Sequence, residues 1–129
     1  MSVRAAFFGI ALVSTVACGL FGPQDTVCTL QPRYALQVTV YDSVSGGGAA
    51  SGASIVARDG SFVDSVAVVS APVPAGFFLL LGRDRPGLYQ LTVRKVGYRD
   101  WTQSGIRVLS NDCGVVRVDI AVRLQPAAP

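Results

Sequence analysis

From Arg33 onward, hydrophobic and polar side chains alternate with a period of two, which is typical of half-buried β-strands and not of helices. In YALQVTVYD (34–42), Leu36, Val38 and Val40 share one face, while the polar or aromatic residues between them share the other. Turn signals such as Asp59-Gly60 separate the alternating segments. The pattern predicts seven strands, at 34–42, 53–59, 61–69, 77–81, 88–96, 98–108 and 115–124. We therefore expect an all-β fold, an antiparallel β-sandwich.

The last predicted strand alternates cleanly, which places one set of its apolar residues on a single face. The members of that set are Val116, Val118, Ile120, Val122 and Leu124. The residues after it, QPAAP (125–129), are predicted to form a frayed end.

The run FFLLL (77–81) is apolar at every position, so alternation sends Phe78 and Leu80 to the face opposite Phe77, Leu79 and Leu81. One set fills the core of a two-layer sandwich. The other set, Phe78 and Leu80, is either covered by the loops 45–51 and 69–75 or exposed as a contact surface for a partner.

The first 17 residues have the features of an export signal. Arg4 supplies a positive charge, and the apolar run AAFFGIALVSTVA is shorter than the roughly 20 residues that span a bilayer. The residues Thr15, Val16, Ala17 and Cys18 resemble the lipobox of bacterial lipoproteins, although Thr15 stands where Leu is usual. The resemblance implies cleavage before Cys18 and lipid attachment to it; an ordinary signal peptide is the alternative. Gly19, in place of the Asp that favours inner-membrane retention, points to the outer membrane.

Cysteine parity agrees with lipid attachment. With Cys18 set aside, Cys28 and Cys113 form an even pair in an exported chain, where thiols are expected to be oxidised. We therefore predict a Cys28–Cys113 disulfide.

Two segments of the domain carry a family resemblance. GLYQLTVRKVGY resembles the Gly-x-Tyr-x-Leu-x-Val-x-x-x-Gly-Tyr pattern of carboxypeptidase regulatory-like domains, and SGGGAASGASIVARD resembles the first loop and second strand of the family. The matching positions are Gly52, Ala53, Ile55, Gly87, Tyr89, Leu91, Val93, Gly97 and Tyr98. The resemblance covers roughly Arg33 to Leu124 and implies a seven-stranded Greek-key sandwich, transthyretin-like (prealbumin-like), with no active site of its own.

The reactive side chains that the sequence lacks exclude several classes of function. The chain has no His and no Glu, so a His-based triad, a His-containing zinc site and a Glu general base are excluded. Basic residues are scattered and the net charge is only +3, which does not indicate nucleic-acid binding. Lys95 and Asn111 are the sole Lys and Asn available for an isopeptide bond, and we expect Lys95 instead to be solvated on a strand face. No catalytic residue, metal or cofactor is predicted.

Tyr98 and Trp101, in GYRDW, are candidates for an aromatic platform that binds a sugar, with Arg99 and Asp100 as hydrogen-bonding neighbours. The alternative is that Tyr98 keeps the fold and Trp101 caps a sandwich edge.

These observations divide the chain into a signal peptide (1–17), a lipid-anchored tether (18–32), a β-sandwich (33–124) and a tail (125–129). The predicted function is a non-enzymatic envelope module, held at the membrane by its N-terminal lipid, that binds an envelope protein. A carbohydrate- or polymer-binding module is the second hypothesis. The candidate binding residues are Phe78, Leu80, Tyr98 and Trp101.

Overall fold

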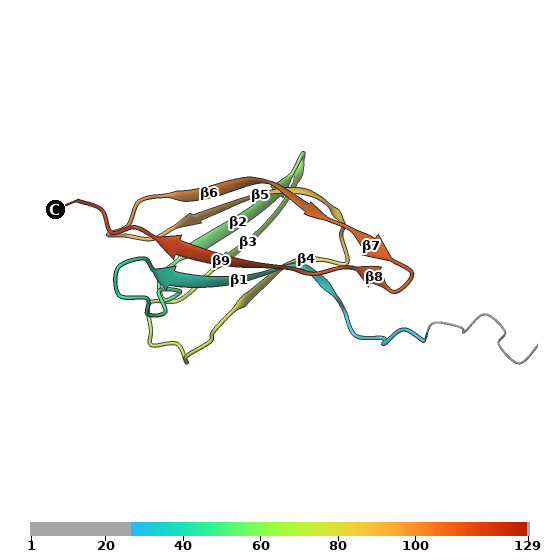
Figure 1. The fold of residues 1–129 in the computed structure, drawn as a ribbon, viewed down its shortest axis with the longest axis horizontal. Helices are drawn as coiled ribbons and strands as arrows, with labels where there is room; N and C mark the ends of the chain where they lie inside the picture. The colour runs from blue at the N-terminus through green and yellow to red at the C-terminus, as the bar shows by residue number, and fades with distance from the viewer. Residues whose placement is uncertain (1–26, 129) are drawn as a thin grey trace, which may run out of the picture.

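The computed structural model describes residues 27–128, and all regular structure in this part of the chain is β-strand. The strands are β1 (Tyr34–Asp42), β2 (Ser54–Asp59), β3 (Phe62–Ala67), β4 (Leu79–Arg83), β5 (Gly87–Arg94), β6 (Trp101–Val108), β7 (Ser110–Asn111), β8 (Gly114–Val115) and β9 (Val118–Leu124) (Figure 1). The predicted all-β class is confirmed. Each of the seven predicted segments overlaps one of the longer strands, although β4 and β5 extend beyond their predicted bounds, and the short β7 and β8 form an additional hairpin that was not predicted.

Two sheets form the body of the domain. One has three strands in the order β4-β1-β9, and the other has four in the order β3-β2-β5-β6. Side chains from both sheets build one hydrophobic core, in which Tyr89 is the largest fully buried residue. Each large apolar side chain buried in this way stabilises the fold by about 1.5–3 kcal/mol.

The alternation predicted for the first and fifth long strands is confirmed by burial. In β1, Leu36, Val38 and Val40 are at most 1% exposed, and in β5 Leu91 and Val93 are fully buried. The period of two thus places the core residues of both sheets, because successive side chains of a strand point to opposite faces.

One strand pair differs from the predicted antiparallel arrangement. β9 pairs with β1 in parallel, with Leu36 opposite Val118 and Asp42 opposite Leu124. The chain leaves β6 in the four-stranded sheet and crosses to the other sheet through β7 and β8, so it enters β9 in the same direction as β1. Such a crossover is what a parallel pair requires.

The last predicted strand, 115–124, is interrupted. β8 ends at Val115, which is 2% exposed, and β9 begins at Val118, so Val116 does not continue the inward-facing set and is 45% exposed. The Val116 amide donates a hydrogen bond to the Leu109 carbonyl, which holds this residue in the projecting β7–β8 hairpin and away from the core. The prediction for Val116 was wrong, and for Val122 and Leu124 it is confirmed.

Residues 125–127 are held in place, in contrast to the frayed end that the sequence predicts. Pro126 forms a β-bridge with Tyr98, and the Ala127 amide donates to the Gly97 carbonyl. The Arg99 amide also donates to the Gln125 carbonyl, so the tail continues the sheet contacts of β9 past its end.

Candidate functional site

A disulfide joins Cys28, before β1, to Cys113, in the turn between β7 and β8. The two Cα atoms are 5.2 Å apart and the residues are 85 positions apart in sequence. The pairing predicted from parity is therefore confirmed. Cys18, the predicted lipidation site, lies outside the described residues, as do the predicted signal peptide and the first part of the tether.

Hydrogen bonds fix the backbone around this disulfide end. The Cys113 amide donates to Asn111 Oδ1 at 2.9 Å, which stabilises the tight turn that carries the cysteine. On the N-terminal side, the Arg33 amide donates to Asp84 Oδ1 at 3.0 Å and the Asp84 amide donates back to the Arg33 carbonyl at 2.7 Å. The segment between Cys28 and β1 is thus tied to two other parts of the domain.

Beside the disulfide end lies a groove of about 370 Å³. It is lined by Pro32, Arg33, Tyr34, Leu80, Asn111, Val115, Val116 and Arg117. Leu80 was predicted to belong to a contact surface. Its neighbours in the groove come from distant parts of the sequence, and no local pattern in the chain indicates that they meet.

The apolar run 77–81 divides between the two faces of its sheet as predicted. Leu81 is fully buried and Leu79 is 9% exposed, whereas Phe78, just before β4, is 48% exposed. Leu80, opposite Gln37 of β1, is half-buried. The loops around residues 46–50 and 73–77 border a hollow of about 470 Å³ over Thr39 and Tyr41. Phe78 does not line this hollow, and its 48% exposure shows that the loops do not cover it fully.

Tyr98 anchors the turn after β5 to the end of β1. Its hydroxyl donates to Asp42 Oδ2 at 2.6 Å, and the Lys95 ammonium lies 5.2 Å from the centre of its ring. Lys95 Nζ also donates to the Ala49 carbonyl at 3.1 Å, so Lys95 follows β5 as a half-buried bridge and is not solvated on a strand face as predicted. Asp42 in turn accepts hydrogen bonds from the amides of Val44 and Ser45.

These hydrogen bonds shift the pKa values of both Asp42 and Tyr98. The bond from Tyr98, with those from the two amides, lowers the pKa of Asp42 below its ordinary value, because the ionised carboxylate is the better acceptor. The same bond raises the pKa of Tyr98, since ionisation would remove the donor proton. Asp42 therefore stabilises the fold above its ordinary pKa, and this contribution is lost as pH falls through the lowered value. Tyr98 stabilises the fold below its ordinary pKa, and this contribution is lost as pH rises through the raised value.

Removing the Tyr98 hydroxyl tests whether its hydrogen bond to Asp42 contributes to stability. In Tyr98→Phe we expect a small loss of stability near neutral pH and a weaker dependence of the free energy of unfolding on pH in both the acidic and the alkaline range. Urea unfolding followed by circular dichroism from pH 3 to pH 11 would measure it. Tyr41→Phe is the control, because within residues 27–128 the Tyr41 hydroxyl forms no hydrogen bond, and it should reproduce the parent profile in acid. Identical acidic profiles for parent and Tyr98→Phe would contradict the proposed coupling.

Trp101, at the start of β6, is half-buried and packs against the core. It pairs with Val93 of β5, on the inward-facing side of that strand. Its remaining surface lines a shallow hollow of about 230 Å³, together with Arg99, Asp100, Arg123 and Gln125. The Asp100 carboxylate accepts from Arg94 Nε at 3.1 Å.

The structure does not bring the four predicted binding residues together on one surface. Phe78 and Leu80 belong to the β4 side of the three-stranded sheet, and Trp101 belongs to the edge strand of the four-stranded sheet. Tyr98 has its hydroxyl engaged with Asp42, and its ring faces the Lys95 ammonium.

No family model matches the chain, and no curated protein matches it either. Within residues 27–128, no group of three or more His, Cys, Asp or Glu side chains is placed to hold a metal ion. In the same part of the chain, no helix has the length and apolar character needed to cross a membrane.

Proposed function

We propose that this protein is a lipid-anchored, non-catalytic β-sandwich of the bacterial envelope that binds another envelope protein through the outer face of β4. In this proposal the domain is a carboxypeptidase regulatory-like sandwich of seven Greek-key strands, transthyretin-like in its arrangement, and Cys18 carries the lipid that holds it at the outer membrane.

The burial of the resembling residues supports the proposed kind of domain. Leu91 and Val93 are fully buried and Tyr89 is 1% exposed, as residues that maintain a fold should be. Gly97 has a φ of +85°, in the left-handed region that favours glycine, at the turn that presents Tyr98 to Asp42. The chain also passes repeatedly between the two sheets, as Greek-key connections do.

The disulfide supports export. Disulfides persist in oxidising compartments and are rare in the cytosol of mesophiles. With Cys28 and Cys113 joined, Cys18 is the one remaining cysteine of the chain, at the position that the lipobox resemblance assigns to lipid. Two acyl chains on that residue would give stable membrane attachment.

The observation that carries the binding function is the exposure of Phe78. A phenylalanine that is 48% exposed lies beside the edge strand β4, near a half-buried Leu80 that lines the 370 Å³ groove. Contiguous exposed apolar surface of this kind marks contact sites for other proteins. Aromatic side chains are enriched among the residues that dominate binding energy at such sites.

The test compares Phe78→Asp with Val63→Asp. Val63 is 47% exposed on β3, in the other sheet, so the control adds the same charge at a matched exposure. We expect Phe78→Asp, tagged and purified from detergent-solubilised envelopes, to lose a co-purifying envelope protein that the parent and Val63→Asp retain. Loss of a desolvated aromatic anchor should weaken binding by roughly 2 kcal/mol or more. Circular dichroism melts should show both variants folded.

Retention of the same partner by Phe78→Asp would place the interface elsewhere. Unfolding of Phe78→Asp alone would show that Phe78 serves the core.

A carbohydrate- or polymer-binding function is the second candidate, favoured by the hollow in which Trp101 lies beside Arg99 and Asp100. It is the weaker of the two, because much of the Trp101 surface packs on the core and Asp100 already accepts from Arg94.

A further inference from the structure

Four exposed apolar side chains gather at the disulfide end of the domain. Leu30 and Val27 are almost completely exposed, at 103% and 92%, and Leu109 and Val116 are 61% and 45% exposed. We refer to Val27, Leu30, Leu109 and Val116 together as the apolar tip.

The geometry of the chain brings these residues to one end. The Val116 amide donates to the Leu109 carbonyl at 2.8 Å, which extends the β7–β8 register of Ser110 with Val115 by one pair. Leu109 and Val116 are therefore cross-strand neighbours with side chains on the same face of the hairpin. Figure 1 shows this hairpin projecting from the body at the end opposite the C-terminus.

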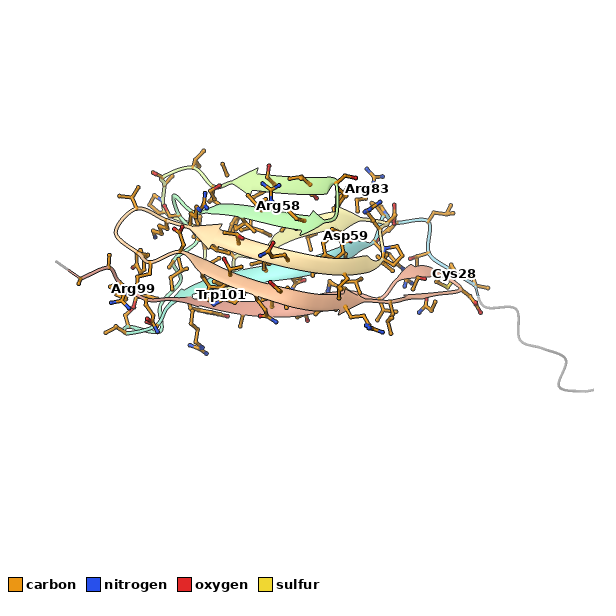
Figure 2. The ribbon with its side chains drawn as sticks, turned by 90° about the horizontal axis from the view of Figure 1, so that it is seen from above. Cys28, Arg58, Asp59, Arg83, Arg99 and Trp101 are labelled. Atoms are coloured by element: carbon orange, nitrogen blue, oxygen red, sulfur yellow. A yellow bond between two sulfur atoms is a disulfide. The ribbon has the colours of Figure 1, made fainter. Side chains whose placement is uncertain are left out.

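The disulfide brings the other two members to the hairpin. Val27 precedes Cys28 directly and Leu30 follows it by two positions, and Cys28 is bonded to Cys113 in the hairpin turn. Figure 2 shows Cys28 at this end of the domain and Arg99 at the other. The point at which the chain enters the domain is thereby fixed at the tip and not at the start of β1.

We propose that the apolar tip rests on the lipid bilayer and orients the domain with its disulfide end toward the membrane. This inference depends on the proposed lipid attachment at Cys18. Nine residue steps separate Cys18 from Val27, and a fully extended chain covers at most about 3.3–3.6 Å per residue, or roughly 30 Å. A lipid at Cys18 would therefore keep Val27 within roughly 30 Å of the bilayer surface.

Charge at this end does not oppose contact with a bilayer. Arg83 lies 3.7 Å from Asp84, and Arg117 Nε lies 2.9 Å from Asp119 Oδ1. Arg33, beside Gly114, and Asp112, in the hairpin turn, add one charge of each sign, so the net charge at this end is balanced. Exposed valines also occur elsewhere, and Val96 is 97% exposed. What distinguishes the tip is that the disulfide fixes it to the segment leading to the lipid.

The experiment measures the depth of a single tryptophan. Trp101 is the only tryptophan of the chain, so Trp101→Phe provides a background in which Leu109→Trp reports on the tip. Val96→Trp in the same background is the matched control, in the turn that precedes Tyr98. Each full-length protein, purified from native membranes, is reconstituted in phosphatidylethanolamine–phosphatidylglycerol vesicles with and without brominated acyl chains. Circular dichroism verifies folding, and flotation verifies attachment.

We expect brominated lipid to quench the tryptophan fluorescence of the Leu109→Trp variant several-fold more than that of the Val96→Trp variant. Equal quenching of both probes, or of neither, in protein that floats with the vesicles would overturn the orientation and leave the lipid anchor standing. Protein that does not float would overturn the anchor itself. If Leu109→Trp is shielded from iodide in native membranes but is not quenched by brominated lipid, a protein covers the tip and the bilayer proposal is wrong.

Discussion

Breaking the Cys28–Cys113 disulfide should lower the free energy of unfolding by about 4 to 5 kcal/mol. The bond closes a loop across 85 positions, which contains strands β1 to β7. In the chain-entropy model a loop of that size strongly restricts the unfolded ensemble, and the loss on reduction is correspondingly large. Small domains have only about 5–15 kcal/mol of stability in total, so the reduced protein should be close to unfolding at physiological temperature.

Urea unfolding with and without reductant measures this effect. The double variant Cys28→Ser/Cys113→Ser is the control, because it should match the reduced parent and be insensitive to reductant. Little change in the urea midpoint on reduction would show that residues 27–33, which contain no strand, already detach before the sandwich unfolds. In that case the disulfide would position the N-terminal segment without stabilising the domain.

The parts of the structure that follow from local rules were predictable from the sequence. The period of two placed Leu36, Val38 and Val40 in the core of the sandwich, because alternation along a strand is a property of neighbouring residues alone. The division of the run 77–81 between buried Leu79 and Leu81 and exposed Phe78 follows from the same rule. The disulfide was predictable because two cysteines remained to form one pair.

The parts that depend on contacts between distant residues were not predictable. The bond from Tyr98 to Asp42 joins residues 56 positions apart, and nothing near either residue indicates the other. Val116 is apolar, as a core residue should be. However, β8 ends one residue earlier, at Val115, and the Val116 side chain is left exposed. The parallel pairing of β9 with β1 likewise depends on the path of the whole chain, which alternation does not encode.

The same distinction applies to the proposed surfaces. The exposed Phe78 was predicted from a local pattern, whereas the groove that Leu80 lines requires Tyr34 and Val115 to converge on it from two other segments. The apolar tip also depends on contacts between distant residues, because the disulfide and the hairpin create it together.

Gly82→Ala should destabilise the domain by about 2 to 5 kcal/mol. Gly82 lies in β4 with a φ of +71°, and a Cβ placed there would be 2.8 Å from the Ala35 Cβ and 2.9 Å from the Tyr89 hydroxyl oxygen. The left-handed conformation accounts for about 1–2 kcal/mol of the loss. Crowding in a packed core adds about 1–3 kcal/mol, because neither neighbour is free to move. Tyr89 is 1% exposed and its hydroxyl donates to the Arg85 carbonyl, while the Gly82 amide donates to Asp64 Oδ2.

Gly46→Ala separates the two contributions, because Gly46 has a φ of +73° and its added Cβ would meet no atom within 4 Å. We expect this control to lose only the conformational share, and urea unfolding of both variants measures the difference. Combining Gly82→Ala with Tyr89→Phe removes the oxygen that lies 2.9 Å from the new Cβ, so the double variant should be less destabilised than the sum of the two single variants. Equal losses for Gly46→Ala and Gly82→Ala, with additive behaviour of the pair, would show that the core around Tyr89 accommodates a methyl group. The positive φ at Gly82 would then be the whole reason that glycine is required at this position.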